Sequence, residues 1–110
     1  MNRDRPFEFR EATRTNLEAP IVVSVAGGDE VLVKTANVSF GGCFVAMRTP
    51  PPVGTSVRLA LDLEGHAVNA FAEVVWIRLS SKSLDQPVGM GLQFRHFIDD
   101  GLEILSSYLP

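Results

Sequence analysis

The chain has 110 residues, a hydrophobic fraction of 45% and a formal net charge of −3, which together are typical of one globular domain that folds alone. Proteins that grip DNA or RNA usually carry a basic stripe, so the net acidity argues against a nucleic-acid-binding protein. The single cysteine, Cys43, excludes an internal disulfide, and one cysteine with two distant histidines provides no zinc site.

The N-terminal residues differ from the remainder of the chain. Residues 1–19 are polar, with arginines interleaved among acidic residues, and they show no hydrophobic period. We predict that they form a flexible arm and that a folded domain covers residues 20–110. No apolar run reaches the roughly 18 residues of a membrane-spanning helix, and the first residues lack the apolar stretch of a signal peptide. We therefore expect a cytoplasmic protein with no membrane insertion, no metal and no cofactor.

Alternation of apolar and polar residues, the pattern of a half-buried strand, recurs along the folded domain. The clearest case is the segment 57–63, where Val57, Leu59 and Leu61 alternate with polar or small residues. Turn residues and prolines separate the apolar segments. The predicted strands cover residues 21–25, 31–38, 43–47, 57–63, 66–79 and 88–95.

The end of the chain changes to a helical period. Ile98, Leu102, Leu105 and Leu109 are spaced by four, three and four residues, which places them on one helical face. The acidic pair Asp99–Asp100 suits the start of this helix, where we expect it to act as a cap and not as a general acid–base pair. Short antiparallel strands without β-α-β alternation predict an all-β fold, a six-stranded antiparallel β-barrel with a short C-terminal helix.

Two short motifs lie near the N-terminal side of this barrel. Arg10 and Arg14 form the pattern RxxxR, and after residues 15–36 the segment 37–42 reads NxSxxG. In this order the two motifs resemble the two-part signature of the bacterial PilZ domain family. The segments Val74–Trp76 and Gly89–Phe94 resemble the family too, so the resemblance covers almost the whole chain.

The resemblance implies a receptor for the second messenger cyclic di-GMP, with no catalytic activity. It implies the ligand-binding residues Arg10, Arg14, Asn37, Ser39 and Gly42, with Phe9, Gly41 and Trp76 as secondary candidates. It also implies that ligand binding orders the arm on the barrel and changes the surface that a downstream protein partner meets. The sequence leaves that partner unidentified, and it leaves open whether the domain is a monomer or a homodimer.

The motif residues suit this ligand on chemical grounds as well. An arginine fork pairs with a phosphate or with guanine O6 and N7, and its flat face stacks on a base. The amide of Asn37 can accept from the N–H edge of guanine, or donate to a phosphate. Ser39 offers a hydroxyl, and Gly42 allows close approach of a base or of backbone and makes positive φ available.

Other interpretations remain open from the sequence. The domain could be a ligand-independent PilZ-like interaction adaptor, or its arginines could be solvated charges beside an ordinary turn. The pattern favours a core or barrel-wall position for Trp76 over a ligand contact. Many relatives carry a basic residue where this chain has Phe9, so the number of bound ligands, one or a stacked pair, stays open. Cys43 falls in an apolar run and is expected to be buried and unreactive.

Overall fold

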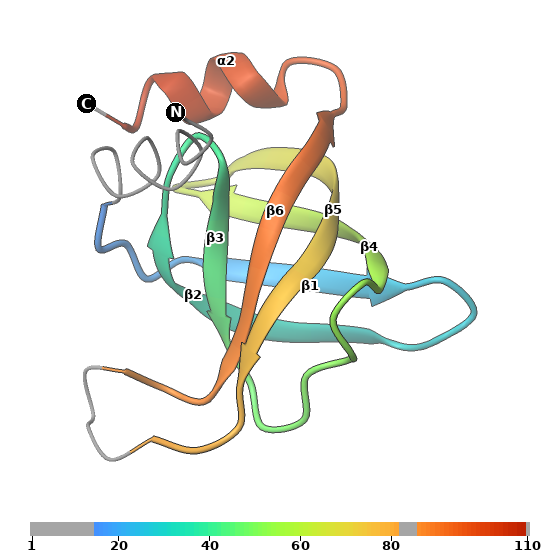
Figure 1. Ribbon diagram of the computed structural model, residues 1–110. Helices are drawn as coiled ribbons and strands as arrows, with labels where there is room; N and C mark the ends of the chain where they lie inside the picture. The colour runs from blue at the N-terminus through green and yellow to red at the C-terminus, as the bar shows by residue number, and fades with distance from the viewer. Residues whose placement is uncertain (1–14, 82–85, 110) are drawn as a thin grey trace, which may run out of the picture.

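The computed structural model describes residues 15–81 and 86–109, and over these residues the chain forms a closed β-barrel (Figure 1). The strands are β1 (Pro20–Val25), β2 (Glu30–Val38), β3 (Gly42–Ala46), β4 (Ser56–Leu63), β5 (His66–Arg78) and β6 (Gly89–Phe97). They close in the order β1-β2-β3-β6-β5-β4, and all neighbouring pairs are antiparallel. One helix, α2 (Gly101–Ser106), follows β6 in the described part of the chain. The predicted fold, six antiparallel strands and a short C-terminal helix, is confirmed.

The barrel interior is filled by every second side chain of its strands. On β4, Val57, Leu59 and Leu61 are at most 3% exposed, whereas Arg58 between them is exposed. This follows from strand geometry, since successive side chains point to opposite faces of a sheet. Closure pairs each strand on both sides, so the described barrel leaves no long unpaired edge. The apolar alternation of the sequence therefore sets both the core and the outer surface.

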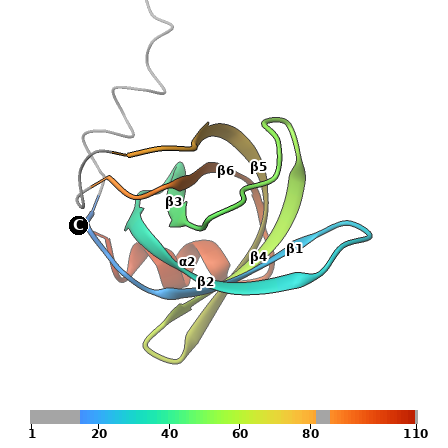
Figure 2. The ribbon, with the colours of Figure 1, turned by 90° about the horizontal axis from the view of Figure 1, so that it is seen from below.

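Helix α2 lies across one end of the barrel (Figures 1 and 2). Gly101 and Leu105, four residues apart, form its buried face, and Leu109 is buried beyond the helix end. The predicted face is wrong at Leu102, which is 48% exposed because Gly101 is the residue that rests against β5. Asp100 occupies the N-cap position, but its side chain makes no capping hydrogen bond, so the predicted capping role is not observed.

Three strands contain one extra residue relative to their partners. Thr35 pairs with Val45 whereas Asn37 pairs with Phe44, so Ala36 is the extra residue of β2. Similar shifts make Val75 the extra residue of β5 and Arg95 that of β6. A bulge of this kind changes which face the following side chains occupy. These irregularities were not predicted from the sequence.

Residues 15–19 run along β2 and are fastened to it. Thr15 exchanges two backbone hydrogen bonds of 2.9 Å with Val38. Further along, the buried hydroxyl of Thr35 donates to the carbonyl of Leu17 at 2.7 Å and accepts from the N–H of Ala19 at 3.0 Å. Thr35 is 1% exposed and Ala19 is 4% exposed, so water cannot readily replace these bonds. The described part of the predicted arm is thus attached to the barrel wall.

Candidate functional site

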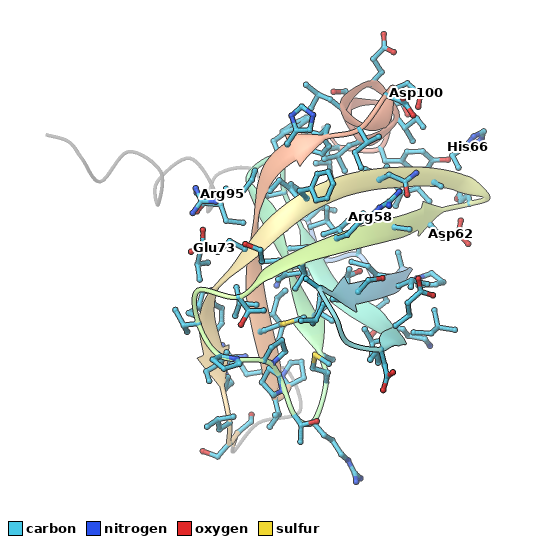
Figure 3. All side chains as sticks on the ribbon, turned by 90° about the vertical axis from the view of Figure 1, so that its right-hand side faces the viewer. Arg58, Asp62, His66, Glu73, Arg95 and Asp100 are labelled. Carbon is cyan, nitrogen blue, oxygen red and sulfur yellow. The ribbon has the colours of Figure 1, made fainter. Side chains whose placement is uncertain are left out.

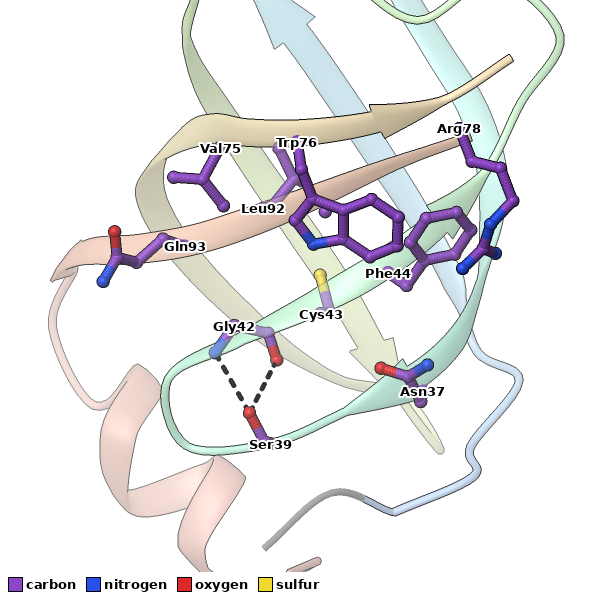
Figure 4. A pocket seen from close by; sticks show the side chains of 11 residues that line it. Asn37, Ser39, Gly42, Cys43, Phe44, Val75, Trp76, Arg78, Leu92 and Gln93 are labelled. Atoms are coloured by element: carbon purple, nitrogen blue, oxygen red, sulfur yellow. Dashed lines mark hydrogen bonds between the residues drawn. The ribbon is translucent and has the colours of Figure 1, made fainter. Parts of the chain in front are cut away.

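A pocket opens on the outer face of the barrel where β2, β3, β6 and β5 lie side by side (Figure 4). Its lining residues are Asn37, Ser39, Gly42, Cys43, Phe44, Val75, Trp76, Arg78, Gly91, Leu92 and Gln93. Three of the five residues predicted first as ligand-binding, Asn37, Ser39 and Gly42, line it together. Phe9, Arg10 and Arg14 lie outside the described residues.

The floor of the pocket is one row of residues across four strands. Asn37 of β2 pairs with Phe44 of β3, Phe44 pairs with Gly91 of β6, and Gly91 pairs with Trp76 of β5. The indole lies directly on Gly91, since a Cβ at that position would come within 2.1 Å of the indole Nε1. The rings of Phe44 and Trp76 lie 5.0 Å apart at an angle of 31°. The row therefore presents the Asn37 amide and the Trp76 indole on one surface, and the ring of Phe44, which is 4% exposed, packs beside the indole.

The sequence pattern favoured a core or barrel-wall position for Trp76, and the structure places this residue in the barrel wall with its side chain on the outer face. It is 41% exposed and lines the pocket. Val74 faces the core, so simple alternation would turn Trp76 inward as well. Because Val75 is an extra residue, Trp76 faces outward and Ile77 returns to pack against the core.

Arg78 supplies the positive charge of the pocket. Its guanidinium lies 5.0 Å from the ring centroids of both Phe44 and Trp76, a distance typical of cation–π contacts. It also donates a hydrogen bond of 3.1 Å to the carbonyl of Pro87. Within residues 15–81 and 86–109, Arg78 is the one charged side chain that lines the pocket, and no carboxylate pairs with it. The pocket is consequently suited to an anion that also has a flat aromatic part.

The hydroxyl of Ser39 is occupied by the turn between β2 and β3. It donates to the carbonyl of Gly42 at 3.3 Å and accepts from the N–H of Gly42 at 3.3 Å (Figure 4). It also accepts from the N–H of Gly41 at 3.2 Å. Ser39 is 4% exposed. A hydroxyl has one donor and two acceptor positions, and these three bonds use all of them. The Ser39 hydroxyl therefore shapes the site by holding the turn, and it has no free position for a ligand. Gly41 belongs to the same turn and does not line the pocket.

Gly42 is required for a close approach of two strands. A Cβ at this position would lie 1.9 Å from the carbonyl oxygen of Leu92 on β6. Its φ lies outside the left-handed region, so the expectation that positive φ could be used here is wrong. The expected close approach of backbone is confirmed, and it concerns the packing of β3 against β6.

Asn37 differs from Ser39 because its side chain has no hydrogen-bond partner within the described residues. The bulge at Ala36 places it on the outer surface opposite Phe44. Its amide oxygen and amide nitrogen are both available to a ligand. Asn37 is therefore the polar group of the NxSxxG motif that can contact a ligand directly.

The sequence reasoning missed Phe44, Arg78, Gly91 and Gln93 as pocket residues. A glycine within an apolar strand pattern signals a close approach, and this signal could have identified Gly91. Cys43 is buried as expected, and burial raises the pKa of its thiol to about 12. Among the residues that the structure describes, no group of three or more His, Cys, Asp or Glu side chains could hold a metal ion. None of the described helices is long and apolar enough to span a membrane.

Comparison with known proteins identifies the family. The family model described as PilZ domain matches residues 8–109. The fold is similar to that of the Bacillus subtilis inhibitor of motility MotI/DgrA, with a TM-score of 0.73 and 24% identity over 87% of this chain and 46% of that chain. It is also similar to the PilZ domain of CeSA from a cellulose-synthesizing bacterium, with a TM-score of 0.63 and 20% identity over 87% of this chain and 93% of that one.

This chain spans about half the length of MotI/DgrA, and at these identities the two structural likenesses establish a shared fold alone. A comparison with curated protein sequences finds no match. The family match covers all of the described barrel, including the NxSxxG segment, of which Asn37, Ser39 and Gly42 line the pocket. The chain belongs to the PilZ domain family.

Proposed function

We propose that this domain is a receptor that binds cyclic di-GMP at the pocket, with Arg10 and Arg14 completing the site, and that it has no catalytic role. The observation that carries the proposal is the bridge between Thr15 and Val38. Thr15 follows Arg14 directly in the chain, and Val38 is part of the NxSxxG segment. The covalent chain thus connects the RxxxR motif to the rim of the pocket, which supports one site formed by both motifs.

The chemistry of the pocket suits the two kinds of group in this ligand. Cyclic di-GMP has two phosphates and two guanines, and arginine pairs with both of them through its planar fork. Arg78 adds a positive charge at the pocket, and the exposed indole of Trp76 offers a surface on which a guanine can stack. PilZ domains are generally receptor or adaptor domains, in agreement with this assignment.

Ligand binding would order the part of the arm that precedes Thr15 against the barrel. Each charge-assisted hydrogen bond from an arginine contributes roughly 1.5–3 kcal/mol, which offsets the entropy lost when the arm is fixed. A ligand shifts this equilibrium only if it binds the arm-docked state more tightly than the arm-free state. The resulting change in surface is what a downstream protein partner would recognise.

The decisive experiment is calorimetric titration of the protein with cyclic di-GMP, with GTP and a single-stranded oligonucleotide as control ligands. We expect a dissociation constant of about 1 µM or lower for cyclic di-GMP, and no such binding of the two control ligands. Arg14→Ala should remove most of the binding, and Arg14→Lys should not restore it, because an ammonium lacks the planar fork. Arg48→Ala, an exposed arginine outside the pocket, is the matched control and should bind normally. No heat at millimolar ligand would reject the proposal and favour a ligand-independent adaptor.

A second titration assigns the role of Asn37. If its amide accepts from the N–H edge of guanine, Asn37→Asp should keep or improve affinity, since a charged acceptor is stronger. If the amide donates to a phosphate, the same substitution should weaken binding through like-charge repulsion. A clear loss of affinity in a folded variant therefore contradicts the guanine-edge assignment.

A further inference from the structure

The outer face of β2, β1 and β4 forms a second surface that takes no part in the pocket. The antiparallel registers arrange its outward side chains in three rows across these strands. The first row is Glu30, Ser24 and Arg58, and the second is Leu32, Val22 and Ala60. The third row is Lys34, Pro20 and Asp62. Asp62 belongs to it because Ile21 pairs with Leu61, so the next residue of β4 lies beside Pro20. These nine residues are called the β1 face below, because β1 is its central strand.

The β1 face exposes a large apolar side chain among four charged residues that form no ion pair within the described part of the chain. Glu30 accepts a hydrogen bond from the Ser24 hydroxyl at 3.4 Å, and Asp62 accepts one from the N–H of Gly65 at 2.7 Å. Leu32 is 70% exposed. Within residues 15–81 and 86–109, Arg58 and Lys34 form no ion pair, whereas Arg95 elsewhere on the barrel pairs with Glu73 at 2.6 Å (Figure 3). A single exposed leucine is ordinary on a protein surface, and it is the arrangement of the charges around Leu32 that points to an interface.

The charges of the β1 face are complementary to those of the same face in a second copy. Along β2 the face is negative at Glu30 and positive at Lys34. Along β4 the order is reversed, with Arg58 in the row of Glu30 and Asp62 in the row of Lys34. A two-fold axis parallel to β1, lying between two copies packed face to face, exchanges the positions of β2 and β4. Each charge then meets an opposite charge: Glu30 meets Arg58 of the second copy, and Lys34 meets Asp62.

The sizes of the side chains also suit this arrangement. A barrel surface is convex, so two copies approach most closely at the central strand and diverge on both sides. The central strand carries the short side chains of Ser24, Val22 and Pro20, whereas the long charged side chains stand on the flanking strands. In the middle row the large Leu32 meets the small Ala60 of the second copy. Paired sheets commonly pack with their strands within about 30° of parallel, which this axis permits.

We propose that the domain forms a symmetric homodimer through the β1 face. The interface has four ion pairs around a small apolar centre, and it is isologous, as expected for a two-fold dimer. With nine residues on each side it is smaller than standard interfaces, so the dimer forms at high protein concentration. The pocket lies on the opposite side of the strand order, over β3 and β6, and stays accessible in the dimer. The dimer is therefore independent of ligand binding.

Sedimentation velocity of the whole chain tests this dimer at protein concentrations from about 10 µM to about 1 mM. We expect the dimer fraction to rise over this range and to fall at high salt. Arg58→Glu should raise the dimer dissociation constant at least about tenfold, because Glu30 then meets a like charge. Glu30→Arg should have the same effect. The double substitution Glu30→Arg with Arg58→Glu should restore the dimer, since the charges are exchanged and again opposite.

Two controls separate this interface from other causes. Arg48→Glu makes the same change of charge at an exposed position outside the β1 face and should leave the dimer intact. Ser24→Cys lies on the proposed axis, so a short bismaleimide should cross-link two copies, whereas Thr49→Cys should not. The native Cys43 does not interfere because it is buried. A monomer at every concentration, a dimer that Arg58→Glu leaves unchanged, or failure of the exchanged pair to restore it would each overturn the proposal.

Discussion

The substitution Ser39→Ala separates a structural role of the NxSxxG motif from a ligand-contacting role. The hydroxyl makes three hydrogen bonds within its own turn, to the carbonyl of Gly42 and from the N–H groups of Gly41 and Gly42. Its removal leaves two N–H groups without this acceptor, at a residue that is only 4% exposed. Each lost bond costs about 1 kcal/mol, and Gly41 is partly accessible to water, so we expect a loss of about 1–2 kcal/mol in the free energy of unfolding.

Urea unfolding followed by circular dichroism measures this loss, and calorimetric titration of the folded variant measures its affinity for cyclic di-GMP. We expect reduced stability with affinity lowered less than about tenfold, because the ligand need not touch this hydroxyl. Ser106→Ala is the matched control, since its hydroxyl is exposed and bonds only to the carbonyl of Leu102, and it should change stability by less than about 0.5 kcal/mol. If Ser39→Ala unfolds like the unmodified protein yet no longer binds, the hydroxyl contacts the ligand and our assignment is wrong.

Three further predictions follow from the described contacts. Trp76→Ala should weaken cyclic di-GMP binding about tenfold or more by removing a stacking surface, while Leu79→Ala, an exposed apolar residue outside the pocket, should not. Thr35→Val should destabilise the protein by about 1–3 kcal/mol and speed amide exchange at Ala19, whose N–H loses its acceptor; unchanged exchange would show that residues 15–19 are held by other contacts. Burial raises the pKa of Cys43 from 9.0 to about 12, so the protonated thiol stabilises the native state fully below pH 9 and progressively less as the pH rises toward 12. The free energy of unfolding should then fall above pH 9 by about 1.4 kcal/mol per pH unit more than in Cys43→Ala, and equal slopes would contradict this.

The barrel could be predicted from the sequence because strands without an extra residue, above all β4, keep a regular alternation of apolar and polar side chains. On β4 the buried and exposed positions follow the apolar pattern without a break over Ser56–Leu63. The helix was placed correctly, and Leu105 and Leu109 of its predicted face are buried, but Leu102 is exposed because Gly101 is the residue that rests on the barrel. A glycine contributes nothing to a hydrophobic pattern, so periodicity cannot identify it as a contact residue.

The part of the site that could be predicted from the sequence is the part that a motif of residue types identifies. The NxSxxG residues were recognised together, and the structure brings Asn37, Ser39 and Gly42 to one pocket. The division of their roles could not be foreseen, because it depends on which hydroxyl and amide groups the turn already uses. Trp76 was only a secondary candidate because a bulge shifts the alternation by one residue, and nothing in the apolar sequence around Val75 marks that shift.

The bulge at Val75 leads to a prediction that ordinary strand reasoning would not make. Deleting Val75 should leave Val74 facing the core, Trp76 opposite Gly91 and Ile77 against the core, because it is the unpaired extra residue. We expect a loss of less than about 1.5 kcal/mol in the free energy of unfolding and retained ligand binding.

Deleting Ala60 from the unbroken strand β4 is the contrast, since it would turn Leu61 and Leu63 from the core to the solvent. Exposing each of these leucines costs about 1.5–3 kcal/mol, and the sum of about 3–6 kcal/mol reaches the lower end of the roughly 5–15 kcal/mol by which a domain is stable. Thermal unfolding of both deletion variants tests this difference, and we expect the Ala60 deletion to be much less stable than the Val75 deletion. Similar and severe destabilisation of both would show that the barrel needs the bulge itself, and not only the outward direction that the bulge gives Trp76.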